Sequence, residues 1–117
     1  MIFVLDSKTE IKIVRKSCYD DEKGTDYNGV VNTTISGRSC QRWNTKSPHD
    51  PSSAAKNPLN FPEKSLSAAV NYCRNPTGSR SPWCYTTDPD KEWDYCDILP
   101  CNGSTEIMRE IIIIYII

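Results

Sequence analysis

Apolar residues are few and scattered through the central part of the chain, from residue 18 to residue 101. Leu, Ile, Val and Phe together number nine in these 84 residues. All eight Pro of the chain and four of its five Gly mark turns every few residues in the same region. This pattern predicts a loop-rich domain without helices, with short strands at Val30 to Ile35 and Trp83 to Thr87. Thr45 to Lys64 has no periodicity and is predicted to be a surface loop.

Residues 1–17 are predicted to be an N-terminal tail. Only four consecutive apolar residues, Ile2 to Leu5, precede Asp6. A secretory signal needs a basic start and an apolar stretch of about 7 to 15 residues, so we expect no signal peptide here. The alternation of Ile11, Ile13 and Val14 indicates either a short strand or the end of an upstream domain, and the sequence leaves both open.

Residues 102–117 change character again, from a polar linker to a segment rich in Ile. The unbroken apolar run, Ile111 to Ile117, has seven residues, whereas a helix needs about 20 to span a bilayer. Two interpretations remain open. The run is either the start of a truncated transmembrane segment or the end of an incorrect gene model. As a neutral, β-branched segment, it is also prone to aggregate.

Six Cys lie within the central window and suggest a disulfide framework. The numbers of residues between successive Cys are 21, 32, 10, 11 and 4, and His49 is the only His. Because zinc sites need ligand pairs close in sequence, this spacing excludes a zinc site, and no other metal or cofactor is expected. Six Cys allow 15 connectivities, and their spacing does not choose among them. An oxidising compartment combined with the missing signal indicates a piece of a longer secreted or membrane-bound protein.

The charge balance and the motifs narrow the set of possible functions. The chain has 14 basic and 15 acidic residues, so no strong field would hold it on nucleic acid or on an anionic membrane. It lacks the Gly-Asp-Ser-Gly-Gly and Gly-x-Ser-x-Gly signatures, a glycine-rich phosphate loop and a second His, and we therefore expect no enzymatic activity from it. Sequons at Asn32 and Asn102 are typical of an exported glycoprotein.

Four segments resemble the kringle domain family: Cys40 to Trp43, Asn71 to Pro76, Pro82 to Pro89 and Trp93 to Ile98. The resemblance covers one kringle, residues 18–101, with six Cys in order. It implies a small disulfide-rich fold, loop-rich with a few short antiparallel strands. It also implies the pairing of Cys18 with Cys101, Cys40 with Cys84 and Cys73 with Cys96. Around residues 52–57 the chain looks a few residues longer than most relatives.

The resemblance implies a non-catalytic, extracellular module that binds a protein partner or other domains of its own parent chain. Many kringles hold a lysine side chain in an aromatic trough between a pair of carboxylates and a basic group. The aromatic positions match Trp83, Tyr85 and Trp93. The carboxylates, expected just after Pro76, are absent, and Glu92 stands where such relatives often carry Arg. We therefore expect little or no lysine binding.

Several alternatives stay open at this point. Trp43 is predicted to lie in the core, whereas Trp83 and Trp93 fit either a core or an exposed trough. Glu92, flanked by Asp90 and Asp94, favours a solvated turn, although a basic side chain of a partner could lie across Trp93. His49 is predicted to be structural. The chain could also be a fragment of a kringle-containing serine protease or receptor kinase, or a purely structural spacer in an ectodomain.

Overall fold

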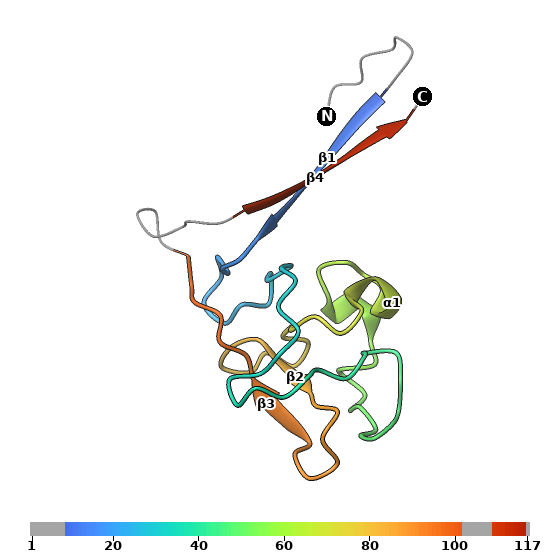
Figure 1. Ribbon diagram of the computed structural model, residues 1–117. Coiled ribbons are helices and arrows are strands. Elements are labelled where there is room, and N and C mark those ends of the chain that lie inside the picture. Colours follow the sequence, from blue (N-terminus) through green and yellow to red (C-terminus); the bar gives the residue numbers. More distant parts are fainter. Residues whose placement is uncertain (1–8, 102–108, 117) are drawn as a thin grey trace.

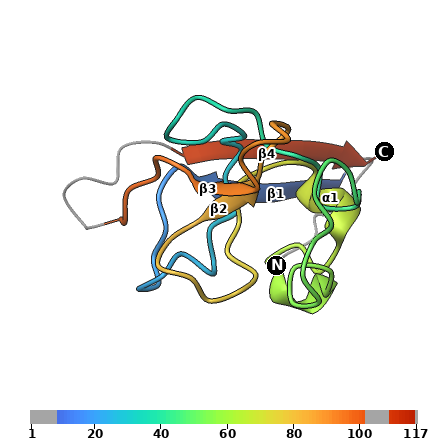
Figure 2. The ribbon, with the colours of Figure 1, turned by 90° about the horizontal axis from the view of Figure 1, so that it is seen from below.

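Two small antiparallel sheets and two short helices make up the regular structure. The computed structural model describes residues 9–101 and 109–116, with side chains described for residues 15–101. Strands β2 and β3 form a hairpin within the central body, and β1 pairs with β4 in a ribbon that extends from it (Figures 1 and 2). The bounds are β1 Thr9–Lys16, the 3-10 helix η1 Pro58–Asn60, α1 Leu66–Ala69, β2 Trp83–Tyr85, β3 Trp93–Tyr95 and β4 Arg109–Ile116.

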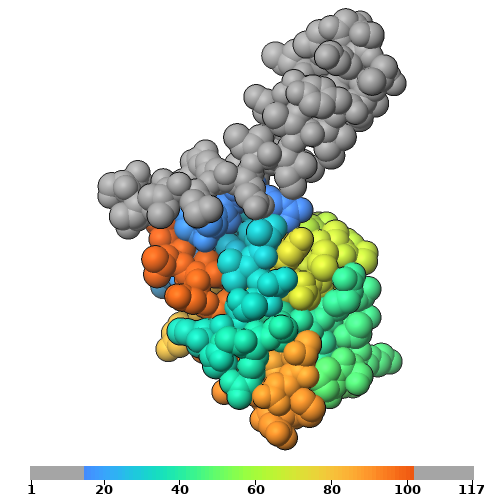
Figure 3. All heavy atoms as spheres, in the orientation of Figure 1, coloured from blue at the N-terminus to red at the C-terminus, as the bar shows by residue number. Residues whose placement is uncertain are grey.

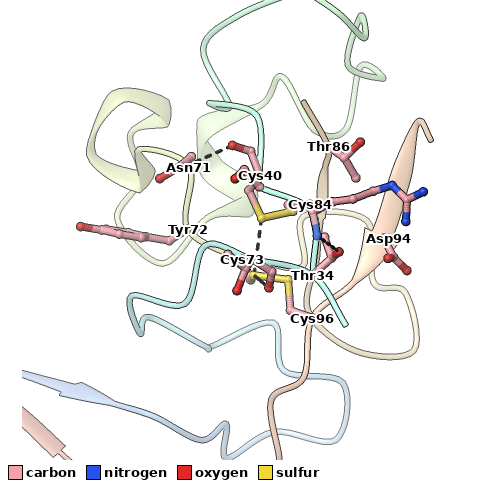
Figure 4. The surroundings of a disulfide bond; sticks show 12 residues. Thr34, Cys40, Asn71, Tyr72, Cys73, Cys84, Thr86, Asp94 and Cys96 are labelled. Atoms are coloured by element: carbon pink, nitrogen blue, oxygen red, sulfur yellow. Dashed lines mark hydrogen bonds between the residues drawn. A yellow bond between two sulfur atoms is a disulfide. The ribbon is translucent and has the colours of Figure 1, made fainter. Parts of the chain in front are cut away.

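Three disulfides replace much of the missing aliphatic core. They join Cys18 to Cys101, Cys40 to Cys84 and Cys73 to Cys96, the pairing that the resemblance implies. The latter two are buried side by side, with the Sγ atoms of Cys40 and Cys73 3.8 Å apart (Figure 4). These four sulfurs all lie within 4.8 Å of one another, but each is in a disulfide and so cannot serve as a thiolate ligand for a metal.

Trp43 lies at the centre of the aromatic core, which confirms its prediction as a core residue. Its side chain is only 2% exposed. The Trp43 ring meets Phe61, Trp83 and Tyr85 edge to face, with centroid distances of 5.1, 5.3 and 6.0 Å. Its indole Nε1 donates a hydrogen bond to the Tyr72 carbonyl oxygen at 2.7 Å, so this buried donor is paired.

Arg74 is a second buried centre, next to the disulfides. Its side chain is fully buried, and its Nε and Nη2 atoms donate to the carboxylate of Glu63. Nη1 donates to two backbone carbonyls, those of Gly29 at 2.9 Å and Cys73 at 2.6 Å. The guanidinium also lies against the rings of two tyrosines, Tyr27 and Tyr72. Carboxylate, carbonyls and rings together compensate for burying the charge.

The prediction that the domain has no helices is wrong. In α1, Ser65 is the N-cap, and its hydroxyl accepts a hydrogen bond from the Ala68 N–H. In η1, the Asn57 side chain accepts from the Leu59 N–H. Helices of four and three residues have no room to show a 3.6-residue period, so the hydrophobic pattern cannot reveal them.

Part of the predicted surface loop from Thr45 to Lys64 is also buried. Ala55 and Phe61 belong to the core, and Phe61 packs against Trp43. The segment from Val30 to Ile35, predicted to be a strand, forms no strand and only an isolated bridge at Thr33. The turn at residues 35–36 ends the extended segment soon after this bridge.

The strand prediction at Trp83 holds for three residues, and the ends of the chain contain further strands. β2 pairs with β3 in the register Trp83 with Tyr95 and Tyr85 with Trp93. The N-terminal alternation lies in β1, which pairs with β4 from Thr9 opposite Ile116 to Lys16 opposite Arg109. The Ile run therefore lies in a strand up to Ile116, although a truncated transmembrane segment was one of its two interpretations from the sequence. Among the described residues, no helix has the length and apolar character needed to cross a membrane.

Candidate functional site

The β2–β3 hairpin presents four aromatic side chains on one face. Alternate residues of a strand point to the same side, and residues opposite each other in the register share that side. Trp83, Tyr85, Trp93 and Tyr95 therefore form a continuous row. The successive ring centroids from Tyr85 to Trp83, Trp93 and Tyr95 are 4.9, 6.1 and 5.0 Å apart, and each pair meets edge to face. We call these four residues the aromatic row.

Part of the aromatic row lines a surface depression of about 340 Å³, which we call the aromatic depression. Trp83 and Tyr85 are buried at its base, and Trp93, 43% exposed, forms a wall. Of the two possibilities left open by the sequence, Trp83 thus belongs to the core and Trp93 lies at the surface. The turn that follows Thr86 projects from the lower end of the body, coloured orange in Figure 3. The lining residues are Thr77, Ser79, Trp83, Tyr85, Glu92 and Trp93.

The opposite wall carries hydroxyl groups instead of carboxylates. The Thr77 hydroxyl oxygen accepts a hydrogen bond from the Trp83 indole Nε1 at 3.1 Å and lies 2.6 Å from the Ser79 hydroxyl. Asn75 fixes this turn, because its side-chain oxygen accepts from the Ser79 N–H and its amide donates to the carbonyls of Ser79 and Lys23. Gly78, at φ +66°, supplies the left-handed residue that the turn requires.

Glu92 carries the only formal charge among the described residues that line the aromatic depression. It is exposed and forms no ion pair with a side chain of residues 15–101. Two nearby acidic residues, Asp88 and Asp94, have side-chain partners in contrast. The Asp90 N–H and the Arg38 side chain lower the pKa of Asp88 below its usual 3.8. Burial acts to raise the pKa of Asp94, but hydrogen bonds, first of all from Ser36, outweigh it and lower the pKa.

His49 contacts the turn that connects β2 to β3. One ring nitrogen, Nε2, lies 2.8 Å from the Asp88 carbonyl oxygen, and the His49 N–H donates to the Gln41 side chain. His49 therefore has the structural role that the sequence predicts. Asp50, next to His49 in the chain, is instead in an ion pair with Lys56.

Arg80 is a surface residue that the sequence analysis did not single out. Its guanidinium lies 4.6 Å from the centroid of the Tyr95 ring, at the end of the aromatic row. No motif marks this position, because the contact depends on the pairing of β2 with β3. Arg74 was missed for the same kind of reason: a charged residue is expected at the surface unless its partners are known.

A family model described as "Kringle domain" matches residues 18–101. This chain belongs to the kringle family. Among its relatives, "Putative apolipoprotein(a)-like protein 2" from Homo sapiens is 39% identical over 102 residues, which cover 87% of this chain and 73% of that protein. "Plasminogen" from Capra hircus is 41% identical over 91 residues, which cover 78% of this chain and 69% of that protein.

As a kringle, the domain is a non-catalytic module of a kind that typically binds proteins in plasminogen-like proteins. The two positions at which the resemblance expects the carboxylates of a lysine-binding kringle are occupied by Thr77 and Ser79. Of the two sequons, Asn32 is exposed, whereas Asn102 lies outside the described residues. An exposed asparagine in a turn region is accessible for glycosylation.

Proposed function

We propose that this kringle acts outside the cell as a non-catalytic module that binds a protein partner through the aromatic depression. A basic side chain of the partner lies across Trp93 beside Glu92. Disulfides persist in oxidising compartments, and the relationship to plasminogen supports the same location. Asn32 is expected to carry a glycan there. N-glycosidase should therefore remove one glycan fewer from Asn32→Gln than from the wild type, because the second sequon, at Asn102, is unchanged in the variant.

The observation that carries the proposal is the exposure of Trp93 beside an unpaired carboxylate. Trp83 and Tyr85 contact the core, so their burial needs no ligand. Trp93 instead keeps 43% of its surface in solvent. A cation over an exposed ring contributes about 0.5 to 1 kcal/mol. An exposed ion pair with Glu92 contributes about 0.2 to 1 kcal/mol more, so one basic side chain binds weakly and a protein partner must add contacts.

Free lysine and its analogues are expected to bind poorly. Their ammonium group would meet the hydroxyls of Thr77 and Ser79, which already bond to each other. Their carboxylate would meet Glu92, a like charge. Charge-assisted hydrogen bonds contribute about 1.5 to 3 kcal/mol, so losing the carboxylate pair weakens binding by more than tenfold. A basic side chain within a peptide has no such carboxylate and avoids the repulsion.

NMR titration of the Trp indole signals tests the proposal. The ligands are N-acetyl-arginine methylamide, which has no carboxylate, and 6-aminohexanoic acid. We expect saturable shifts of the Trp93 signal with the first and much weaker binding of the second. Glu92→Gln and Trp93→Ala should both weaken binding, whereas Glu22→Gln, at an exposed residue that does not line the depression, should not. Tighter binding of 6-aminohexanoic acid would contradict the proposal, and no saturable binding of either ligand would favour a structural spacer.

A further inference from the structure

We propose that Arg80 is an anion-binding end of the partner surface, where it takes a carboxylate of the same partner. This inference rests on the proposed function, because it extends the aromatic depression beyond Trp93. Arg80 is exposed, and its guanidinium lies 4.6 Å from the Tyr95 ring centroid. It forms no ion pair with any side chain of residues 15–101. Stacking on Tyr95 restricts a side chain that would otherwise move freely, so less conformational entropy is lost when a carboxylate binds.

The aromatic row connects Arg80 to the depression. The step from Trp93 to Tyr95 is 5.0 Å, and the step from Tyr95 to the guanidinium is 4.6 Å. Trp93 and the guanidinium are separated by at most the sum of these two steps, a distance that about three extended residues at ~3.3 Å each can span. Ile35, 66% exposed, brings an apolar residue close to this part of the surface, since its backbone N–H donates to the Tyr95 carbonyl. A short peptide segment can therefore reach from Trp93 to Arg80.

The charges along this surface select the chemistry of the partner. Glu92 lies at one end and favours a basic side chain, whereas Arg80 at the other end favours an acidic one. Asp94, the acidic residue of β3, does not neutralise Arg80. It lies opposite Cys84 in the register and therefore on the other face of the hairpin, and its side chain bonds to Ser36. The partner is thus a peptide segment with a basic and an acidic residue about three positions apart.

Four synthetic peptides probe this arrangement in the oxidised full chain. Two carry the charged pair in opposite directions, Ac-Arg-Gly-Gly-Glu-NH2 and Ac-Glu-Gly-Gly-Arg-NH2, because the row does not fix the direction of the partner. The other two replace the glutamate with glutamine and have the same size. Binding is measured from the Trp indole NMR signals. At least one glutamate peptide should bind about two- to fivefold tighter than its glutamine counterpart, as expected for an exposed ion pair.

The variant Arg80→Gln should abolish this preference, and the matched control Lys91→Gln, an exposed basic residue on the neighbouring turn, should keep it. Because the pair is exposed, 0.5 M salt should also reduce the preference. Equal binding of the glutamate and glutamine peptides, or a preference that persists in Arg80→Gln, would overturn the inference. In either case, glutamine peptides that still bind in a Glu92-dependent way leave the proposed function standing. Failure of all four peptides rejects both.

Discussion

Replacing Glu63 with glutamine removes the carboxylate that pairs with Arg74 and leaves a buried cation without its counter-charge. Glutamine keeps the shape of the side chain, and its amide oxygen can still accept a hydrogen bond. The change therefore isolates the charge. Arg74 has no solvent exposure, so water cannot replace the lost carboxylate. We expect this single substitution to lower the free energy of unfolding more than any exposed charge change in the domain.

The magnitude follows from the contacts of the guanidinium. Breaking a buried ion pair by removing one partner typically costs about 3 to 5 kcal/mol. Two features place this pair at the low end of that range. Glu63 is 17% exposed, and Arg74 keeps two carbonyl acceptors and two tyrosine rings. We therefore expect Glu63→Gln to cost about 3 kcal/mol, a large part of the 5 to 15 kcal/mol by which folded domains are usually stable.

Urea unfolding with the disulfides intact, followed by Trp fluorescence, measures this cost. The midpoint should fall while the slope stays unchanged, because the surface exposed on unfolding is the same. Glu22→Gln is the matched control, since Glu22 is exposed, and it should change the stability by less than about 0.5 kcal/mol. A cost for Glu63→Gln as small as that of Glu22→Gln would refute the argument that the pair balances a buried charge.

Three further predictions concern the framework of the domain. Reduction of the disulfides should unfold the domain and abolish its near-ultraviolet circular dichroism. The bridges close loops with sequence separations of 83, 44 and 23, and each contributes roughly 3 to 5 kcal/mol in the chain-entropy model. A reduced chain that keeps the signal and resists protease would contradict this prediction. Asp88 has a lowered pKa, so its contribution to stability is present above pH 3.8 and is lost as the pH falls below that value. The urea midpoint should therefore drop less between pH 5 and pH 3 in Asp88→Asn than in the wild type. An unchanged drop would argue against this contribution of Asp88. Gly29→Ala should destabilise the domain strongly, because a Cβ there would lie 2.3 Å from the Tyr27 hydroxyl and 2.7 Å from the Lys16 carbonyl. At Gly37 a Cβ would have no such atom within 4 Å, so Gly37→Ala should cost only the strain of a positive φ. Equal urea midpoints for the two variants would show that the packing around Gly29 yields.

The sequence predicted the features that depend on residue type and order along the chain. Six Cys in a window with few aliphatic residues indicated a disulfide-rich fold, and the motifs around Trp43, Trp83 and Trp93 indicated the family. Trp43 was predicted to lie in the core because a domain so poor in aliphatic residues must bury its aromatic ones. These inferences need no knowledge of which loops meet in space.

The features that the sequence did not predict depend on contacts between distant segments. Arg74 is buried only because Glu63 and Tyr27, distant in the chain, meet it together with the nearby Tyr72. Phe61 is buried in a proline-rich segment that has no periodicity, because it packs against Trp43. Arg80 reaches the aromatic row only through the pairing of β2 with β3. Charged residues and short helices give no local signal of this kind.

The burial of the aromatic residues also changes what their presence says about binding. Trp83 and Tyr85 both contact Trp43, so the fold needs them whether or not the domain has a ligand. Their match to lysine-binding kringles is therefore weak support for any binding function. Trp93 meets the core ring of Trp83 edge to face, but 43% of its surface stays in solvent. Its exposure has no structural reason among the described contacts, and an exposed tryptophan between Glu92 and Arg80 is what a binding surface would require. The case for a partner thus depends on the residues at the rim of the aromatic depression, where this kringle departs from the lysine-binding pattern.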